Sequence, residues 1–78
     1  MAIESEIIEN IILEIISKQI SKKLTSKDFN KKIVDDLGLD SFAVVEVIYE
    51  IELRFHIKIN NEIIREIKTI RDLVNKIN

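Results

Sequence analysis

The chain has no cysteine, no proline and a single glycine, Gly38. Without cysteine it has no disulfide framework, no thiolate nucleophile and no cysteine-bound metal, a composition that suits a reducing compartment. Proline and glycine are the strongest turn markers, so their scarcity favours a helical fold over one rich in tight turns.

A basic leader and long apolar runs are also missing. Residues 1–6 carry acids where a signal peptide needs bases, and no apolar run approaches the roughly 18 residues of a membrane span. The formal net charge of −2 argues against a nucleic-acid partner, because phosphate binding needs a clustered basic face. We therefore expect a cytoplasmic protein with no membrane insertion and no bound nucleic acid.

The residues that are present suffice for one small domain. Of the 78 residues, 46% are apolar and 33% are charged, which is a globular rather than a disordered balance. A single core is only marginally adequate at this size, so most apolar residues must serve it. We expect one domain spanning residues 1–78 that is monomeric between encounters with partners.

The first segment has apolar residues at helical spacing with acids between them. This pattern predicts an amphipathic helix that ends between Ser17 and Lys23. Its β-branched residues are mediocre helix formers, so burial must hold the helix. The apolar stripe consists of Ile3, Ile7, Ile8, Ile11, Ile12, Ile15 and Ile16.

From about Ser21 to Gly38 the periodicity breaks, which predicts a long loop. Gly38 supplies the freedom for a tight turn, and Asp40 is the expected N-cap of the next helix. The expected apolar anchors of the loop are Phe29, Ile33, Val34 and Leu37. A loose basic stretch is interpreted as a solvated linker, with docking as the alternative: Lys18, Lys22, Lys23, Lys27, Lys31 and Lys32.

A helix from Ser41 to about Phe55 has two apolar faces at 100° per residue. The face expected to pack on the first helix comprises Val44, Val47, Ile48, Ile51 and Phe55. The opposite face comprises Phe42, Val45, Tyr49 and Leu53, with Glu46, Glu50 and Glu52 among or beside them. An exposed apolar stripe rimmed by acids is typical of a partner surface, and additional core is the alternative.

The remainder of the chain predicts a short third helix and a terminal fourth helix. The apolar spacing of Ile63, Ile64 and Ile67 fits the short helix. Thr69 and Asp72 match a capping box that opens the last helix, whose inner stripe is Ile70, Leu73, Val74 and Ile77. The predicted fold is all-α: a small four-helix bundle of three main helices and one short helix, with a long loop between the first two.

Ser41 is placed in the first turn of its helix, where the dipole would stabilise a covalently attached phosphate. As a catalytic nucleophile it would need a base nearby, but His56 lies roughly 22 Å away at 1.5 Å per residue along one helix. We therefore expect no enzymatic activity. Asp35, Asp36 and Asp40 lack the spacing of a calcium loop, so we interpret them as turn and cap residues and expect no metal site.

Several motifs together resemble the acyl carrier protein family, whose hallmark is Asp-Ser-Leu. They are Asp35-Asp36-Leu37-Gly38-Leu39-Asp40-Ser41-Phe42, then Val45-Glu46-Val47, Glu52-Leu53-Arg54-Phe55, Ile57-x-Ile59 and Thr69-Ile70-x-Asp72-Leu73-Val74. The likeness spans nearly the whole chain, and Leu-Gly-x-Asp-Ser in this helical context is its most specific part.

The resemblance implies that Ser41 receives a 4′-phosphopantetheine arm from coenzyme A through a separate phosphopantetheinyl transferase. Asp40 resembles the acidic residue that helps this transferase engage the site. The thiol of the arm would carry acyl groups as thioesters to acyl-transferring and acyl-modifying enzymes. An apolar interior between the helices would shelter the acyl chain, and the second helix would dock on those enzymes.

The chain also departs from the family pattern. Phe42 stands where leucine is usual and Ala43 where an acid is common, while Arg54, His56 and Arg65 dilute the acidic surface. We expect less electrostatic docking, in which Phe42, Val45 and Tyr49 supply hydrophobic contact and the acids Glu46, Glu50, Glu52 and Glu62 supply on-rate and selectivity. A fatty acid carrier and a specialised polyketide, peptide or modified-lipid carrier both stay open.

An unmodified helical interaction module is the alternative function. Under that hypothesis the Phe42-Val45-Tyr49-Leu53 stripe binds a partner helix, and Ser41 only starts its own helix. Tyr49→Glu would then abolish function, whereas Ser41→Ala would have little effect.

Overall fold

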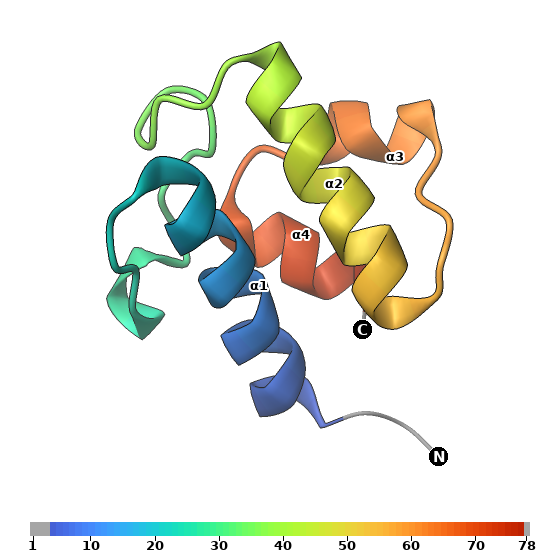
Figure 1. Cartoon of the computed structure of the whole chain (residues 1–78), viewed down its shortest axis with the longest axis horizontal. Helices are drawn as coiled ribbons and strands as arrows, with labels where there is room; N and C mark the ends of the chain where they lie inside the picture. Colours follow the sequence, from blue (N-terminus) through green and yellow to red (C-terminus); the bar gives the residue numbers. More distant parts are fainter. Residues whose placement is uncertain (1–3, 78) are drawn as a thin grey trace.

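The computed structural model describes residues 4–77, so Ile3, which the pattern placed in the first helix, lies outside the described residues. The described chain is all-α, as predicted, and contains no helix long and apolar enough to cross a membrane. Figure 1 shows its elements in order: α1 (Ser5–Ile20), the 3₁₀ helix η1 (Ser26–Asp28), α2 (Ser41–Phe55), α3 (Asn61–Glu66) and α4 (Ile70–Ile77).

Helix α1 ends within the predicted interval, at a left-handed Ser21 whose amide donates to the Ser17 carbonyl. Its buried face is displaced from the predicted stripe. Ile7 is 49% exposed, whereas Leu13, which was not predicted to be part of the stripe, is buried. At 100° per residue Ile7 lies on the far side of the helix from the centre of the buried face, whereas Leu13 lies at one edge of that face. The buried residues of α1 are Ile8, Ile12, Leu13, Ile15 and Ile16.

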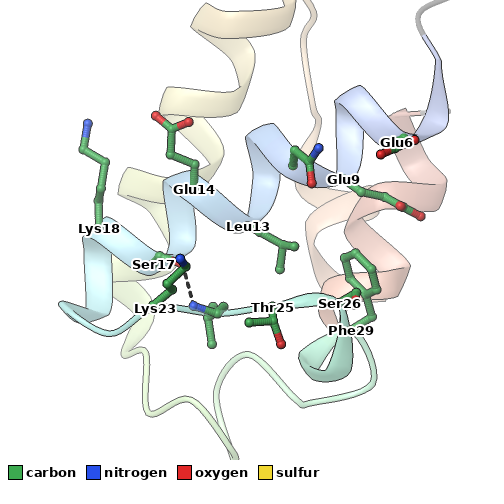
Figure 2. Close-up of a pocket in the computed structure, with 12 residues that line it drawn as sticks. Glu6, Glu9, Leu13, Glu14, Ser17, Lys18, Lys23, Thr25, Ser26 and Phe29 are labelled. Carbon is green, nitrogen blue, oxygen red and sulfur yellow. Dashed lines mark hydrogen bonds between the residues drawn. The ribbon is translucent and has the colours of Figure 1, made fainter.

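The connection between α1 and α2 is pinned at several points, but it is not wholly irregular. It contains η1, which the sequence analysis did not predict and which a capping box between Thr25 and Asp28 stabilises. The Leu24 amide donates to Ser17 Oγ (3.0 Å), which ties the connection to α1 (Figure 2). Phe29 is buried as predicted, whereas Val34, a predicted anchor, is 56% exposed.

Backbone pairing then joins this connection to the start of α4. Lys32 and Thr69 form an antiparallel bridge, in which the Ile33 amide donates to the Lys68 carbonyl (2.9 Å) and the Ile70 amide to the Lys31 carbonyl (3.3 Å). The Arg71 guanidinium lies over the Phe29 ring, 4.4 Å from its centroid. The connection is therefore fixed against the bundle before it reaches α2.

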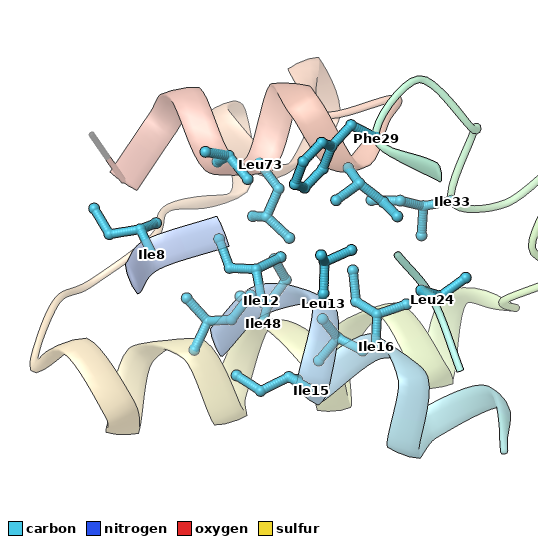
Figure 3. Close-up of a cluster of buried hydrophobic side chains, with 14 of the residues drawn as sticks. Ile8, Ile12, Leu13, Ile15, Ile16, Leu24, Phe29, Ile33, Ile48 and Leu73 are labelled. Carbon is cyan, nitrogen blue, oxygen red and sulfur yellow. The ribbon is translucent and has the colours of Figure 1, made fainter. Parts of the chain in front are cut away.

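One hydrophobic cluster fills the centre, and α2 and α4 both pack against α1. Figure 3 shows side chains of α1 meeting Ile48 from α2, Leu73 from α4 and Phe29 from the connection. The predicted inner face of α2 is confirmed, with Val44 and Phe55 half-buried at its ends. The largest side chains with almost no exposure are Ile12, Ile16, Ile51, Ile70, Leu73 and Val74.

The predicted capping box at the start of α4 is also confirmed. Thr69 Oγ1 accepts from the Asp72 amide (3.1 Å), and Asp72 Oδ2 accepts from the Thr69 amide (3.0 Å) and the Lys68 amide (2.9 Å). These hydrogen bonds to the ionised carboxylate hold the pKa of Asp72 below its ordinary value of 3.8.

Placing a charge on the inner face of α2 should unfold the protein. Ile51 has no exposed surface, and an unpaired buried carboxylate costs on the order of 4 kcal/mol or more. A chain of this length has a total stability of about 4 to 12 kcal/mol. We expect Ile51→Asp, and likewise Val47→Asp, to lose cooperative thermal melting by circular dichroism, while the exposed control Val45→Asp keeps it. Cooperative melting of Ile51→Asp near the wild-type temperature would contradict the assigned faces.

Stability should fall in acid partly through Asp72. Because its folded-state pKa lies below the unfolded value, the capping interaction contributes fully above about pH 4 and is lost as the pH falls through the folded-state pKa. We expect the melting temperature of Asp72→Asn to depend less on pH below about pH 4 than that of the wild type. Asp35→Asn, an exposed control with no side-chain hydrogen bond in the described chain, should keep the wild-type slope, and equal slopes for all three proteins would contradict this role.

Candidate functional site

Ser41 is the first residue of α2 and its side chain is exposed, as predicted. Asp40 precedes it in an extended conformation and is the N-cap, because its Oδ1 accepts from the Ala43 amide (2.8 Å). The Val44 amide donates to the Asp40 carbonyl (3.0 Å). With these two amides satisfied, the amides of Ser41 and Phe42 remain the first-turn donors without an intrahelical partner.

The segment before Asp40 fixes where α2 begins. Gly38 has φ of 77°, a left-handed conformation that strains other residues, although nothing lies within 4 Å of where a Cβ would be. The next residue, Leu39, is buried, and its amide donates to the Ile33 carbonyl (3.2 Å). The turn therefore anchors Leu39 in the core and leaves the following Asp40 and Ser41 at the surface.

Ser41 lies on the edge of a groove of about 890 Å³. One wall is α2, a second is α3 with the residues that follow it, and the third is the connection before Gly38. The lining is mainly apolar and includes four charged side chains. The lining residues besides Ser41 are Lys32, Ile33, Val34, Asp35, Val44, Val45, Ile64, Arg65, Ile67 and Lys68.

A second groove, of about 730 Å³, lies between α1 and residues 23–29 (Figure 2). Ser26, an exposed serine at the first position of η1, lines this groove and is capped by Thr25. Ser26 is therefore a second exposed serine at a helix start beside a groove, and no sequence motif indicated it. The two serines differ because η1 has three residues and carries little dipole, whereas α2 has fifteen. Only Ser41 follows the Leu-Gly-x-Asp sequence.

The outer stripe of α2 is exposed as expected, with exposed fractions of 72% for Phe42, 60% for Val45, 62% for Tyr49 and 56% for Leu53. The alternative that these side chains form additional core is wrong. Glu46, Glu50 and Glu62 are exposed beside or near the stripe. A partner-binding role for these residues stays a prediction.

Glu52 differs from the other acids that were assigned to docking. It is half-buried, and its Oε2 accepts from the Ile59 amide (2.8 Å) seven residues along the chain. This hydrogen bond holds the extended segment between α2 and α3 against the end of α2. The structure therefore gives Glu52 an internal role that the spacing of acids on α2 did not indicate.

The remaining titratable candidates have positions that fit the sequence interpretation. His56 is exposed at the C-cap of α2, at the opposite end of the helix from Ser41. Asp36 Oδ2 accepts from the Lys32 amide (2.7 Å), which is a turn role, and Asp40 is a cap. Among residues 4–77 no three histidine or acidic side chains are grouped to hold a metal ion.

Comparisons with known proteins identify the family to which the chain belongs. A family model described as "Phosphopantetheine attachment site" matches residues 10–77. Acyl carrier proteins are similar over most of the chain. That of Cyanophora paradoxa is 33% identical over 72 residues, covering 92% of this chain and 70% of the relative. That of Rickettsia bellii strain RML369-C is 33% identical over 70 residues, covering 90% and 81%. That of Buchnera aphidicola subsp. Schizaphis graminum is 35% identical over 71 residues, covering 91% and 90%.

The chain therefore belongs to the phosphopantetheine-attachment family of acyl carrier proteins. Its cofactor is a covalently attached 4′-phosphopantetheine, the group through which acyl carrier proteins hold their acyl cargo. The described residues fit such a group, because an exposed serine hydroxyl, free first-turn amides and an adjoining groove occur together at the start of α2.

Removing the cap of α2 should destabilise the start of this helix. We expect Asp40→Ala to lower stability by about 1 kcal/mol, since the Ala43 amide loses its acceptor. This corresponds to a melting temperature lower by about 4 to 8 °C. Asp40→Asn should melt near the wild type because asparagine also caps, so thermal melting of the two variants separates capping from any role of the negative charge. Unchanged melting of Asp40→Ala would show that the cap contributes nothing.

Proposed function

We propose that Ser41 is the attachment residue, and that residues 1–78 act as a single carrier domain presenting acyl thioesters to acyl-transferring and acyl-modifying enzymes. The observation that carries this proposal is the position of Ser41. It is an exposed hydroxyl at the N-terminus of a fifteen-residue helix, directly after a capping aspartate and on the edge of a groove.

The transfer makes simple demands on this chain. Ser41 Oγ forms a bond to the phosphorus nearest the pantetheine of coenzyme A, and the bond to the nucleotide part breaks, which releases the nucleotide. The serine proton must pass to the transferase, because His56 at the far end of α2 is out of reach. The chain itself contributes exposure of the hydroxyl and the helix dipole, and the amides of Ser41 and Phe42 are positioned to solvate the new phosphodiester.

Client enzymes would dock on α2 through the exposed stripe of Phe42, Val45, Tyr49 and Leu53. The acids Glu46, Glu50 and Glu62 would steer the approach, with Arg65 reducing the net negative charge near the site. Hydrophobic contact therefore supplies more of the docking energy than in a strongly acidic carrier. Fatty acid synthesis and a specialised polyketide, peptide or modified-lipid pathway are both compatible with this surface.

The exposed stripe also supports the second candidate, an unmodified module that binds a partner helix through α2. The two functions make different demands on the same chain. The carrier requires the Ser41 hydroxyl, whereas the module requires only the stripe. Modification of the serine therefore distinguishes them.

Intact mass after incubation with coenzyme A, magnesium and a broad-specificity phosphopantetheinyl transferase tests the proposal. We expect a gain of one phosphopantetheinyl group in the wild type, no gain in Ser41→Ala, and full gain in the matched control Ser26→Ala. The exposed position of Ser41 predicts that Ser41→Ala stays folded. A folded wild type that several transferases fail to modify would overturn the carrier proposal and favour the interaction module.

A further inference from the structure

The groove beside Ser41 carries concentrated positive charge although the chain as a whole is negative. Three cations, Lys32, Arg65 and Lys68, line it together with one acid, Asp35. The whole chain has a formal charge of −2, so the excess of positive charge at the groove does not follow from the composition. The cations come from the connection and from the region of α3, and Ser41 lies on the α2 wall.

These three cations have no carboxylate partners among residues 4–77. The four ion pairs of the described chain use other residues: Lys31 with Asp28, Arg54 with Glu14, Arg71 with Glu9, and Lys76 with Glu66. The exposed side chains of Lys32, Arg65 and Lys68 therefore keep their charge available to a group that enters the groove.

Apolar side chains make up the rest of the lining. Val34 and Val45 are 56% and 60% exposed on its walls, and half-buried Ile64 and Ile67 line it from the region of α3. The groove thus combines exposed apolar surface with unpaired cations. A neutral acyl chain that covered this surface would partly desolvate those cations without compensating their charge. An acyl chain that carries an anionic group would instead cover the apolar side chains and pair with the cations.

We propose that this groove accepts acyl groups that carry an anionic group, such as a terminal carboxylate, and that Arg65 and Lys68 bind that group. This inference rests on the proposed function, since it requires the arm to be attached at Ser41. It assigns the charged end of the cargo to the α3 side of the groove and the acyl chain to its apolar walls. The phosphodiester at Ser41 is a competing anion that the experiment must separate from the cargo.

The test loads two cargoes of equal length onto the protein: octanoyl and the corresponding ω-carboxylated acyl chain, each as its phosphopantetheine thioester transferred from coenzyme A. The readout is the rate of thioester cleavage by hydroxylamine, divided by the rate for the same thioester on free coenzyme A. A cargo held in the groove is protected. We expect the carboxylated cargo to be protected about threefold more than octanoyl, the size expected of one or two exposed ion pairs. We also expect the difference to vanish at about 1 M salt.

Variants locate the effect. Arg65→Gln/Lys68→Gln should remove the extra protection of the carboxylated cargo, while Arg54→Gln/Lys58→Gln, which alters exposed cations outside the groove, should keep it. Equal protection of both cargoes in the wild type would overturn the inference. Loss of protection for both cargoes alike in the groove variant would also overturn it, because the cations would then hold the phosphodiester.

The intact mass of the protein, measured before the cleavage assay, separates a failure of the cargo proposal from a failure of the proposed carrier function. A protein that accepts either cargo at Ser41 but fails to distinguish the two retains the carrier function and loses only the cargo assignment. A protein that accepts neither contradicts the proposed function and the cargo inference with it.

Discussion

Burial of α1 is the constraint on which the rest of this structure depends. The chain is short, and its helix-forming stripe of isoleucines has little intrinsic stability, so α1 must be covered on more than one side. Helices α2 and α4 supply two sides, and the connection supplies another through Leu24 and Phe29. A connection that contributes to the core cannot be loose. The backbone bridge between Lys32 and Thr69 and the turn at Gly38 fix its path and, with it, the point where α2 begins.

The exposure of Ser41 follows from this arrangement. Leu39 is held in the core, Asp40 turns its carboxylate back to cap α2, and the next side chain faces solvent. The apolar outer stripe of α2 then has nothing to cover it in the described chain, because the inner face already satisfies the core. Packing in a small bundle thereby produces both an exposed hydroxyl and a neighbouring exposed apolar surface.

Local patterns in the sequence predicted much of this fold and part of the site. The bounds of α2, the capping box of Thr69 and the exposed position of Ser41 all depend on short-range spacing, which is why they could be predicted. The bridge between Lys32 and Thr69 joins residues far apart in sequence, so no local period reveals it.

The groove and its charge were beyond prediction for the same reason. Its lining comes from three separate segments, and the grouping of Lys32, Arg65 and Lys68 depends on how those segments meet. From the sequence, Arg65 was expected only to dilute the acidic charge of the surface. The internal hydrogen bond of Glu52 was likewise missed because its partner, the Ile59 amide, lies in an extended segment beyond the helix.

Peptide mapping of the modified protein tests most directly whether Ser41 is the attachment residue. Trypsin cleavage after Lys32 and Arg54 releases residues 33–54, in which Ser41 is the only serine and no threonine occurs. Fragmentation of this peptide should place the phosphopantetheinyl group on Ser41. An adduct on the peptide of residues 24–27, which holds Thr25 and Ser26 of the other groove, would contradict the account.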